Sequence, residues 1–182
     1  QLYWRCEGPQ SFPALMQWWS SITPSRPVWP GIASVRINSS EDPGRPASEI
    51  GRQIDYSRKL ARQSAGQLYW SWKSLGTNRG GVQAELAKRY TGLAVPPAMP
   101  WSSNVRPNAP QAQVQGSTLV WNNDGTARKF VVQVGKGRQW HTFAILPGNV
   151  TRLPLPPALL NSCDRIAVRP VSGSGLSGVP AV

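Results

Sequence analysis

The chain has 182 residues, of which 40% are hydrophobic, so it has enough apolar sequence for one medium domain or two small ones, and wholesale disorder is excluded. No stretch approaches the roughly 18 consecutive apolar residues that a membrane-spanning helix needs. The 20 basic and 8 acidic residues give a net charge of +12. This charge either marks a surface that attracts polyanions or reflects an arginine-rich composition. The basic residues are scattered along the chain, which favours the compositional explanation.

The chain opens in the middle of an expected element. Residues 1–5 are typical of a β-strand, no methionine precedes them, and no signal peptide is recognisable. We therefore expect a processed or truncated chain.

Three β-prone runs organise the first hundred residues. Residues 1–4 have the sequence Gln-Leu-Tyr-Trp, which recurs at residues 67–70, and residues 28–37 form a third run between them. The runs are separated by about the length of one strand-plus-helix unit, as in a repeated βα fold.

The segments that follow the runs have helical spacing of their apolar residues. In the first, Ser11 is the expected N-cap and Pro13 lies in the first turn. The second stripe ends before Gly66, and the third ends near Gly92. The three stripes comprise Phe12, Leu15, Met16, Trp19 and Ile22; then Ile50, Ile54, Tyr56, Ser57, Leu60 and Ala61; then Val82, Leu86, Ala87 and Tyr90.

Three strand-helix units predict a parallel sheet, because parallel strands need crossover connections. Three strands cannot close a barrel, so an intact protein must supply more strands before residue 1.

The composition changes at residues 95–101, where a proline-rich linker begins that runs to Pro110. The sequence beyond it has no helical period, and about seven short strands in roughly 75 residues predict a β-sandwich with Trp121 in its core. The clearest strand candidates are residues 118–121, 129–134, 139–146, 150–155 and 165–171.

Several motifs, taken in order, resemble the glycosyl hydrolase-like 10 family of bacterial envelope proteins. They are Q-L-Y-W-R, S-F-x-x-L-x-x-W-W, V-W-P-G-I-A, R-Q-I-x-Y-S-R, G-Q-L-Y-W-S-W-K-S-L and P-A-M-P-W. The resemblance implies that residues 1–106 are the C-terminal part of an incomplete (β/α)8 barrel, and that residues 107–182 are a fibronectin type III-like β-sandwich. The usual tyrosine of a late sandwich strand is missing, and residues 166–169 read Ile-Ala-Val-Arg there.

The same resemblance implies that the three runs are barrel strands six, seven and eight. The acidic motif on strand four, which supplies the main catalytic carboxylates, would then lie before residue 1. The resemblance also implies an exported protein of the periplasm or cell envelope that acts on a polysaccharide. A membrane tether would come only from an N-terminal lipoprotein signal outside this sequence.

Barrel enzymes place their active sites at the C-terminal ends of the strands. Tryptophan rings stack on pyranose faces, while arginine and asparagine donate hydrogen bonds to hydroxyls or carboxylates. Lys73 is a candidate for binding an anionic sugar substituent, with a salt bridge at the barrel rim as the alternative. The candidate substrate-binding residues are Tyr3, Trp4, Arg5, Arg36, Asn38, Trp70, Trp72 and Lys73.

The tryptophans have two possible roles. For Trp4, Trp70 and Trp72, sugar stacking and barrel packing are equally supported. For Trp18, Trp19 and Trp29, helical or early-strand positions favour the core.

Glycoside hydrolysis requires two carboxylates about 5 to 10 Å apart. Glu7 is the catalytic candidate in this chain, because it follows the first strand. We expect Glu41 and Asp42 in a solvated loop rather than as a catalytic pair. Three acids are expected on solvated helix faces and two in turns of the β domain: Glu49, Asp55 and Glu85, then Asp124 and Asp164.

Other chemistry has little support. Cys6 and Cys163 are expected to be buried, inert thiols, and the single histidine, His141, excludes a multi-histidine zinc site. Residues 173–178 match G-x-G-x-x-G, but no helix follows, which predicts a hairpin turn. No metal or cofactor is expected.

Three functions are possible. The first, implied by the family resemblance together with the tryptophan-rich strand ends, is glycoside hydrolysis of an envelope polysaccharide such as the glycan strands of peptidoglycan. The second is non-catalytic glycan binding by a barrel that has lost its acids. The third is nucleic-acid binding through the basic surface, which is disfavoured because the tryptophans are not interleaved with basic clusters, so no nucleic-acid partner is expected.

Overall fold

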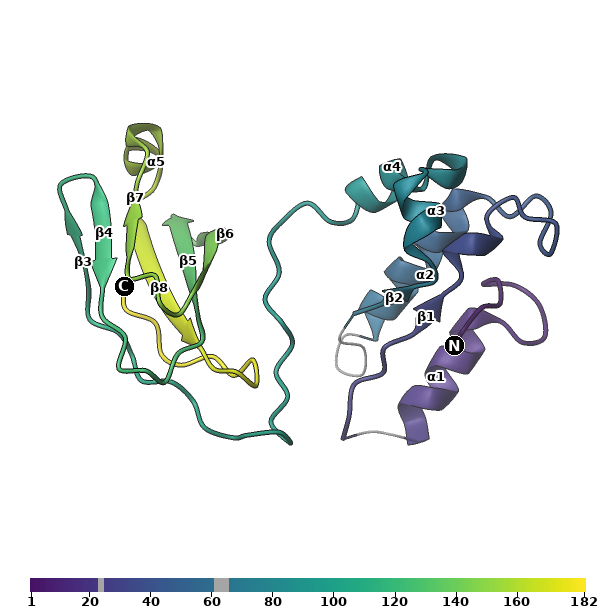
Figure 1. The fold of residues 1–182 in the computed structure, drawn as a ribbon, viewed down its shortest axis with the longest axis horizontal. Helices are drawn as coiled ribbons and strands as arrows, with labels where there is room; N and C mark the ends of the chain where they lie inside the picture. The colour runs from purple at the N-terminus through teal and green to yellow at the C-terminus, as the bar shows by residue number, and fades with distance from the viewer. Residues whose placement is uncertain (23–24, 61–65) are drawn as a thin grey trace. The chain divides into compact units, whose positions relative to one another are not determined.

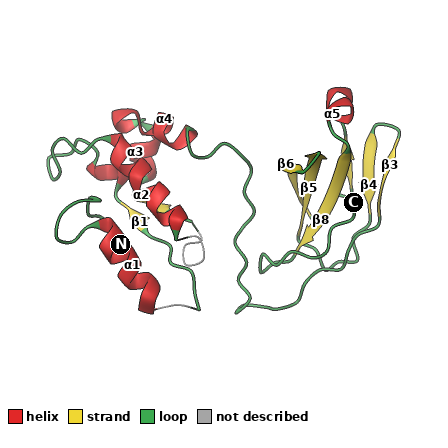
Figure 2. Cartoon of the chain, turned by 180° about the vertical axis from the view of Figure 1, so that it is seen from behind, coloured by secondary structure: helices red, strands yellow, loops and turns green. Residues whose placement is uncertain are grey.

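The computed structural model describes residues 1–22, 25–60 and 66–182. The chain forms two compact units, residues 1–91 and 92–182. Figure 2 shows helices gathered in the first unit and most of the strands in the second. No helix among these residues is long and apolar enough to cross a bilayer.

The first unit alternates short strands and helices, as the sequence predicts (Figure 1). Helix α1 begins at the expected position, where the Ser11 Oγ accepts a hydrogen bond from the Ala14 N–H at 3.3 Å. Of the expected second stripe, Ile50, Ile54 and Ser57 are buried on α2 and Tyr56 is partly buried. Leu60 follows the last residue of the helix, and Ala61 lies outside the described residues. The elements are α1 Phe12–Ile22, β1 Gly31–Ile32, η1 Ser34–Arg36, α2 Ala47–Lys59, β2 Leu68–Tyr69, α3 Trp72–Gly76, η2 Arg79–Gly81 and α4 Val82–Ala87.

The expected parallel sheet is present but small. Strands β1 and β2 pair in parallel, with Gly31 opposite Leu68 and Ile32 opposite Tyr69. Residues 1–4 lie beside β1, where the Leu2 N–H donates to the Gly31 carbonyl at 2.9 Å, but they form no regular strand. The described residues therefore show parallel-sheet topology without a closed barrel.

The core of the first unit lies between this sheet and the helices. Phe12 and Met16 of α1, Ile32 of β1, and Ile50 and Ile54 of α2 are all fully buried in one cluster. The first part of the predicted α1 stripe and the isoleucines of the α2 stripe therefore face the core, whereas Trp19 and Ile22 at the end of α1 are 44% and 50% exposed.

Three tryptophans, two on α1 and one just before β1, do not follow the prediction. Trp18, Trp19 and Trp29 were expected in the core, but their exposed fractions are 54%, 44% and 43%. Trp18 lies two positions after Met16 and six after Phe12, so it points away from the side of α1 that these two residues bury. Trp19 lies seven positions after Phe12, on the same side of the helix, but near its end at Ile22. A helix without charged residues conceals which of its faces is polar.

The second unit contains two three-stranded antiparallel sheets, ordered β3-β4-β7 and β6-β5-β8. Their facing sides share a core in which the Trp121 and Phe130 rings meet edge to face at 5.6 Å. The prediction that Trp121 belongs to the core is confirmed. The elements are β3 Ala112–Gln115, β4 Thr118–Trp121, β5 Lys129–Lys136, β6 Gln139–Pro147, β7 Arg152–Pro154, α5 Pro157–Ser162 and β8 Arg165–Val171.

The proline-rich segment packs on the C-terminal turn of the second unit. The Met99 N–H donates to the Ser174 carbonyl at 2.7 Å. Gly175 has φ +76°, and a Cβ there would lie 2.5 Å from the Pro97 carbonyl oxygen, so only glycine fits. Val171 bridges to Ser177, which confirms that residues 173–178 form a turn. The boundary between the two compact units falls between residues 91 and 92 of the chain. The resemblance implies a domain boundary between residues 106 and 107 instead.

The core of the second unit depends on Phe130, which is 1% exposed. We expect Phe130→Ala to lower the free energy of unfolding of this unit by about 3 to 5 kcal/mol, because it removes a buried ring and leaves a cavity. Chemical denaturation followed by circular dichroism measures the change. The control is Val114→Ala on β3, where the side chain is 48% exposed. A control effect as large as that of Phe130→Ala would contradict the assigned core.

Candidate functional site

Three chain segments bring their C-terminal ends together in the first unit. The Arg36 guanidinium lies 5.8 Å from the centre of the Tyr3 ring. The Val35 N–H donates to the Trp70 carbonyl at 2.9 Å. These two contacts join the segments that follow residues 1–4, β1 and β2. We call this region, formed by residues 3–7, 34–42 and 70–73, the strand-end region.

A buried arginine organises the loop after β1. The Arg45 side chain is fully buried, and its Nη1 donates to the Tyr3 carbonyl at 2.9 Å and to Asp42 Oδ2 at 3.2 Å. The other Asp42 oxygen accepts from Nε of Arg5 at 2.9 Å and also from its Nη2. Hydrogen bonding to Arg5 holds the pKa of Asp42 below its ordinary value. The prediction of a solvated Asp42 is therefore wrong.

Glu49 forms a second support beneath the same region. It was expected on a solvated helix face but is only 4% exposed. Its carboxylate accepts hydrogen bonds from the Cys6 N–H and from Nε2 of Gln53 at 3.3 Å. Gln53 also donates to the Trp4 carbonyl at 2.8 Å. Helix α2 therefore anchors the backbone of residues 4–6 by polar contacts, which the apolar stripe could not reveal.

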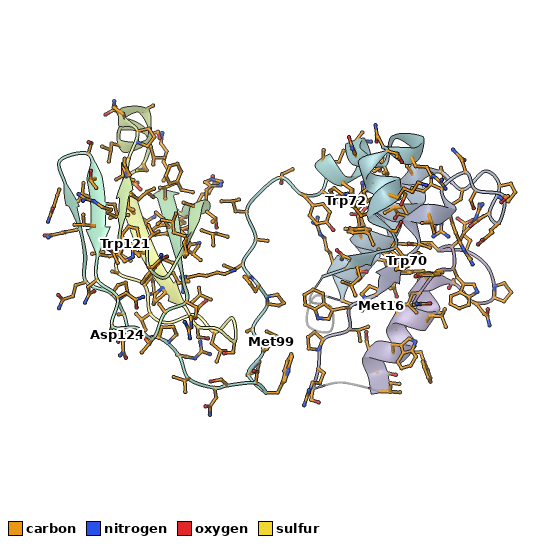
Figure 3. The ribbon with its side chains drawn as sticks, in the orientation of Figure 1. Met16, Trp70, Trp72, Met99, Trp121 and Asp124 are labelled. Atoms are coloured by element: carbon orange, nitrogen blue, oxygen red, sulfur yellow. The ribbon has the colours of Figure 1, made fainter. Side chains whose placement is uncertain are left out.

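The segment after β2 presents two exposed rings. Trp70 and Trp72, labelled in Figure 3, are 61% and 79% exposed. Trp72 begins helix α3, which the sequence analysis missed, and its ring lies against Gly76 one turn later. Packing therefore does not explain either ring. Lys73 is exposed as well, and it forms no salt bridge within the described part of the chain.

A buried pair of hydroxyls fixes the base of these rings. The Ser34 and Ser74 Oγ atoms lie 2.7 Å apart, and the Ser74 hydroxyl donates to the Ser71 carbonyl at 2.7 Å. This bond ties η1 to α3. The neighbouring Asn38 has a left-handed backbone with φ +46°, at the start of the loop that leads to Arg45. Both serines are small polar residues without a recognisable pattern, so no sequence signal indicated them.

Glu7, the catalytic candidate, lies on the surface. Its side chain is 78% exposed and pairs with Nη2 of Arg52 at 2.9 Å. Arg52 also pairs with Glu49 at 3.3 Å. Because Glu7 is solvated rather than enclosed, it lacks the apolar surroundings that usually create a general acid.

All eight acids of the chain have structural partners. Glu41 pairs with Arg36 at 3.6 Å, and Asp55 pairs with Arg89 at 2.7 Å. Glu85 pairs with Lys88 and Arg89 and its side chain is only 16% exposed, so the prediction of a solvated helix face is wrong for Glu85. Asp124 and Asp164 cap turns of the second unit, as predicted.

The cysteines are free and half-buried. Burial is the larger cause and hydrogen bonding to Glu49 the smaller one, and together they raise the pKa of Cys6 to about 12. The thiol is therefore a poor nucleophile. Within residues 1–22, 25–60 and 66–182, no group of three histidine, cysteine or acidic residues could hold a metal ion.

Comparison of the chain with protein families, with characterised proteins and with solved structures finds no match. The resemblance to the glycosyl hydrolase-like 10 family therefore stays a prediction.

Asp42 links an exposed and a buried arginine, so its charge should control the stability of the first unit. We expect Asp42→Asn to lower the free energy of unfolding at pH 7 by about 3 kcal/mol, because it leaves the Arg45 charge buried without its carboxylate. The folded pKa of Asp42 is lowered, so its contribution is present above the unfolded pKa of about 4 and is lost as the pH falls through the folded value. The difference between wild type and variant should shrink below pH 4.

Urea denaturation of both proteins from pH 7 to pH 3 measures this difference. Glu41→Gln is the matched control, because the Glu41 side chain is 74% exposed and its pair with Arg36 should contribute under about 1 kcal/mol. A difference for Asp42→Asn that persists unchanged at pH 3 would refute the role assigned to its charge.

Proposed function

We propose that the first unit is the glycan-binding wall of a glycoside-hydrolase-type barrel that acts on a cell-envelope polysaccharide such as the glycan strands of peptidoglycan. The observation that carries the proposal is the parallel pairing of β1 and β2, with residues 1–4 held beside β1 by the Leu2 N–H bond to the Gly31 carbonyl, so that the segments that follow all three meet in the strand-end region. In barrels built from such units, this end of the sheet binds the substrate.

The side chains of the strand-end region suit a sugar. The exposed rings of Trp70 and Trp72 offer apolar faces for pyranose C–H groups. Arg36 stacks on Tyr3 and retains exposed N–H donors for hydroxyls or carboxylates. Lys73 adds an exposed ammonium, consistent with binding to an anionic sugar substituent.

The chain itself is proposed to bind rather than to cleave. All eight of its carboxylates are already committed to ion pairs or turn hydrogen bonds, and hydrolysis needs one free general acid and a second carboxylate. In this proposal the catalytic carboxylates come from sequence outside this chain. A barrel without any catalytic acids, which would bind glycan only, is the second candidate, and the same commitment of the carboxylates favours it.

The fibronectin type III-like assignment of the second unit belongs to the same proposal. The sheet orders β3-β4-β7 and β6-β5-β8, with Ala181 bridged to Val168 at the free edge of β8, are those of a small Greek-key sandwich. Export to the cell envelope is also part of the proposal, because its substrate lies there.

Exposed rings at the strand ends should dominate glycan affinity. We expect Trp70→Ala to weaken binding of the 182-residue chain to purified insoluble peptidoglycan about tenfold, which corresponds to about 1.4 kcal/mol. Co-sedimentation at increasing glycan concentration measures the affinity. The matched control is Trp18→Ala on α1, which removes a ring of similar exposure away from the strand ends.

Two results would overturn this proposal. One is an absence of binding by the wild-type chain, and the other is an equal loss for Trp18→Ala and Trp70→Ala. Mass spectrometry of the incubated glycan separates binding from cleavage, because shortened glycan strands would show that the chain alone carries the catalytic acids.

A further inference from the structure

One tryptophan of the second unit lies flat on a sheet. Trp140 of β6 is paired with Gly135 of β5. A Cβ on Gly135 would lie 3.1 Å from the Trp140 ring, so the missing side chain leaves room for the ring on the backbone of the neighbouring strand. The ring is nevertheless 37% exposed. Glycine in a strand interior often marks such a close approach.

An arginine from the third strand covers this ring. The Arg165 guanidinium of β8 lies 4.9 Å from the centre of the Trp140 ring. It is held there by a hydrogen bond to the Gly137 carbonyl and by Asp164 at 3.6 Å. Asp164 in turn accepts the Gly137 N–H at 3.0 Å. The stacked pair is therefore fixed by the hairpin turn beside it.

The same face of the sheet carries a second arginine. Arg169 of β8 donates from Nε to Oε1 of Gln133 at 3.3 Å. Gln133 and Gly135 are two positions apart on β5, so they share one face of the strand. This face is opposite the one from which Phe130 and Val132 enter the core. We call Trp140, Arg165, Arg169 and Gln133 the outer-face cluster.

The charge around this cluster is almost entirely positive. Residues 92–182 contain eight basic and two acidic residues, a net charge of 8 − 2 = +6. Asp124 is engaged by Thr126 and Asn108 in its own turn, and hydrogen bonding to Thr126 and Asn108 lowers its pKa to about 2. Lys136 and Arg138 flank the Gly137 turn and are exposed. Few carboxylates are therefore available to neutralise this region.

We propose that the outer-face cluster is a binding site for an acidic polysaccharide, in which Trp140 stacks on a sugar ring and Arg165 and Arg169 bind its carboxylates. An exposed ring supplies the apolar contact, and guanidinium groups bind carboxylates in a fork geometry. The site lies in the second unit and stands independently of the function proposed for the first.

The geometry favours a polysaccharide over a nucleic acid. Single-stranded nucleic acids are bound by several aromatic rings along a groove, so that successive bases can stack. The outer-face cluster contains one ring with cations beside it, which suits one sugar residue and its charged substituent.

Affinity electrophoresis in gels that contain polygalacturonate, with dextran as the neutral polymer, tests the site. The wild-type chain should be retarded by polygalacturonate and much less by dextran. We expect Trp140→Ala and Arg165→Gln each to weaken the retardation constant about tenfold. Arg152→Gln is the matched control, because it removes the same charge from β7 on the other sheet and should change the constant less than twofold.

Gly135→Ala tests the geometry without changing the charge. The added methyl group must displace the Trp140 ring, so we expect a loss of several-fold with an unchanged thermal unfolding midpoint. This variant and Arg165→Gln keep the test decisive if Trp140→Ala does not fold.

Three outcomes would overturn the proposal. The first is an equal loss for Arg152→Gln and Arg165→Gln, which would indicate attraction by net charge alone. The second is tighter binding of oligo(dT) than of polygalacturonate at the same salt concentration, which would indicate a nucleic-acid surface. The third is the absence of retardation by polygalacturonate.

Discussion

The strand-end region depends on one buried guanidinium. Arg45 has no solvent exposure, so its charge must be balanced by carboxylates and carbonyls within the fold. The Arg45 side chain donates hydrogen bonds to the Tyr3 carbonyl and to the Asp42 carboxylate. Asp42 also accepts a hydrogen bond from Arg5. The loop after β1 is therefore tied to the segment beside β1 by charge-assisted hydrogen bonds rather than by a long strand ladder. A sheet with only two residues in each regular strand needs such a link.

This constraint explains why the sequence predicted the arrangement of elements better than the details of the site. Periodicity located α1, α2 and the parallel order of β1 and β2, because burial of apolar faces determines both. It failed for the acids, since Glu49 and Asp42 follow no apolar period yet are largely buried by partners distant in sequence. Charged residues at the base of a site are positioned by tertiary contacts, which a single sequence does not display.

The tryptophans also show how far burial can be predicted from the sequence. Trp121 was assigned correctly to the core, because it lies in a short strand where it shares the buried face with Leu119, two positions earlier. Trp18 was not, because an uncharged helix offers no polar face for comparison. Trp19 follows the apolar period of Phe12 but lies near the end of α1, where its side chain is 44% exposed. Helix α3 and strand β3 were missed for related reasons: α3 starts within an expected strand end, and β3 alternates glutamine with small or half-exposed residues.

The distribution of charge, rather than its total, distinguishes the two units. In the first unit, Arg5, Arg45, Arg52 and Arg89 are each bound to carboxylates, so much of the basic sequence there is structural. In the second unit only Asp164 and Asp124 are acidic, and each also caps a turn. Scatter along the chain favoured a purely compositional origin for the charge of +12. Strand pairing nevertheless brings Arg165 to Trp140 across β5, although 25 positions separate them in sequence. A surplus of cations that folding gathers on one sheet face, with Asp164 as the carboxylate beside Arg165, retains its attraction for an acidic polymer.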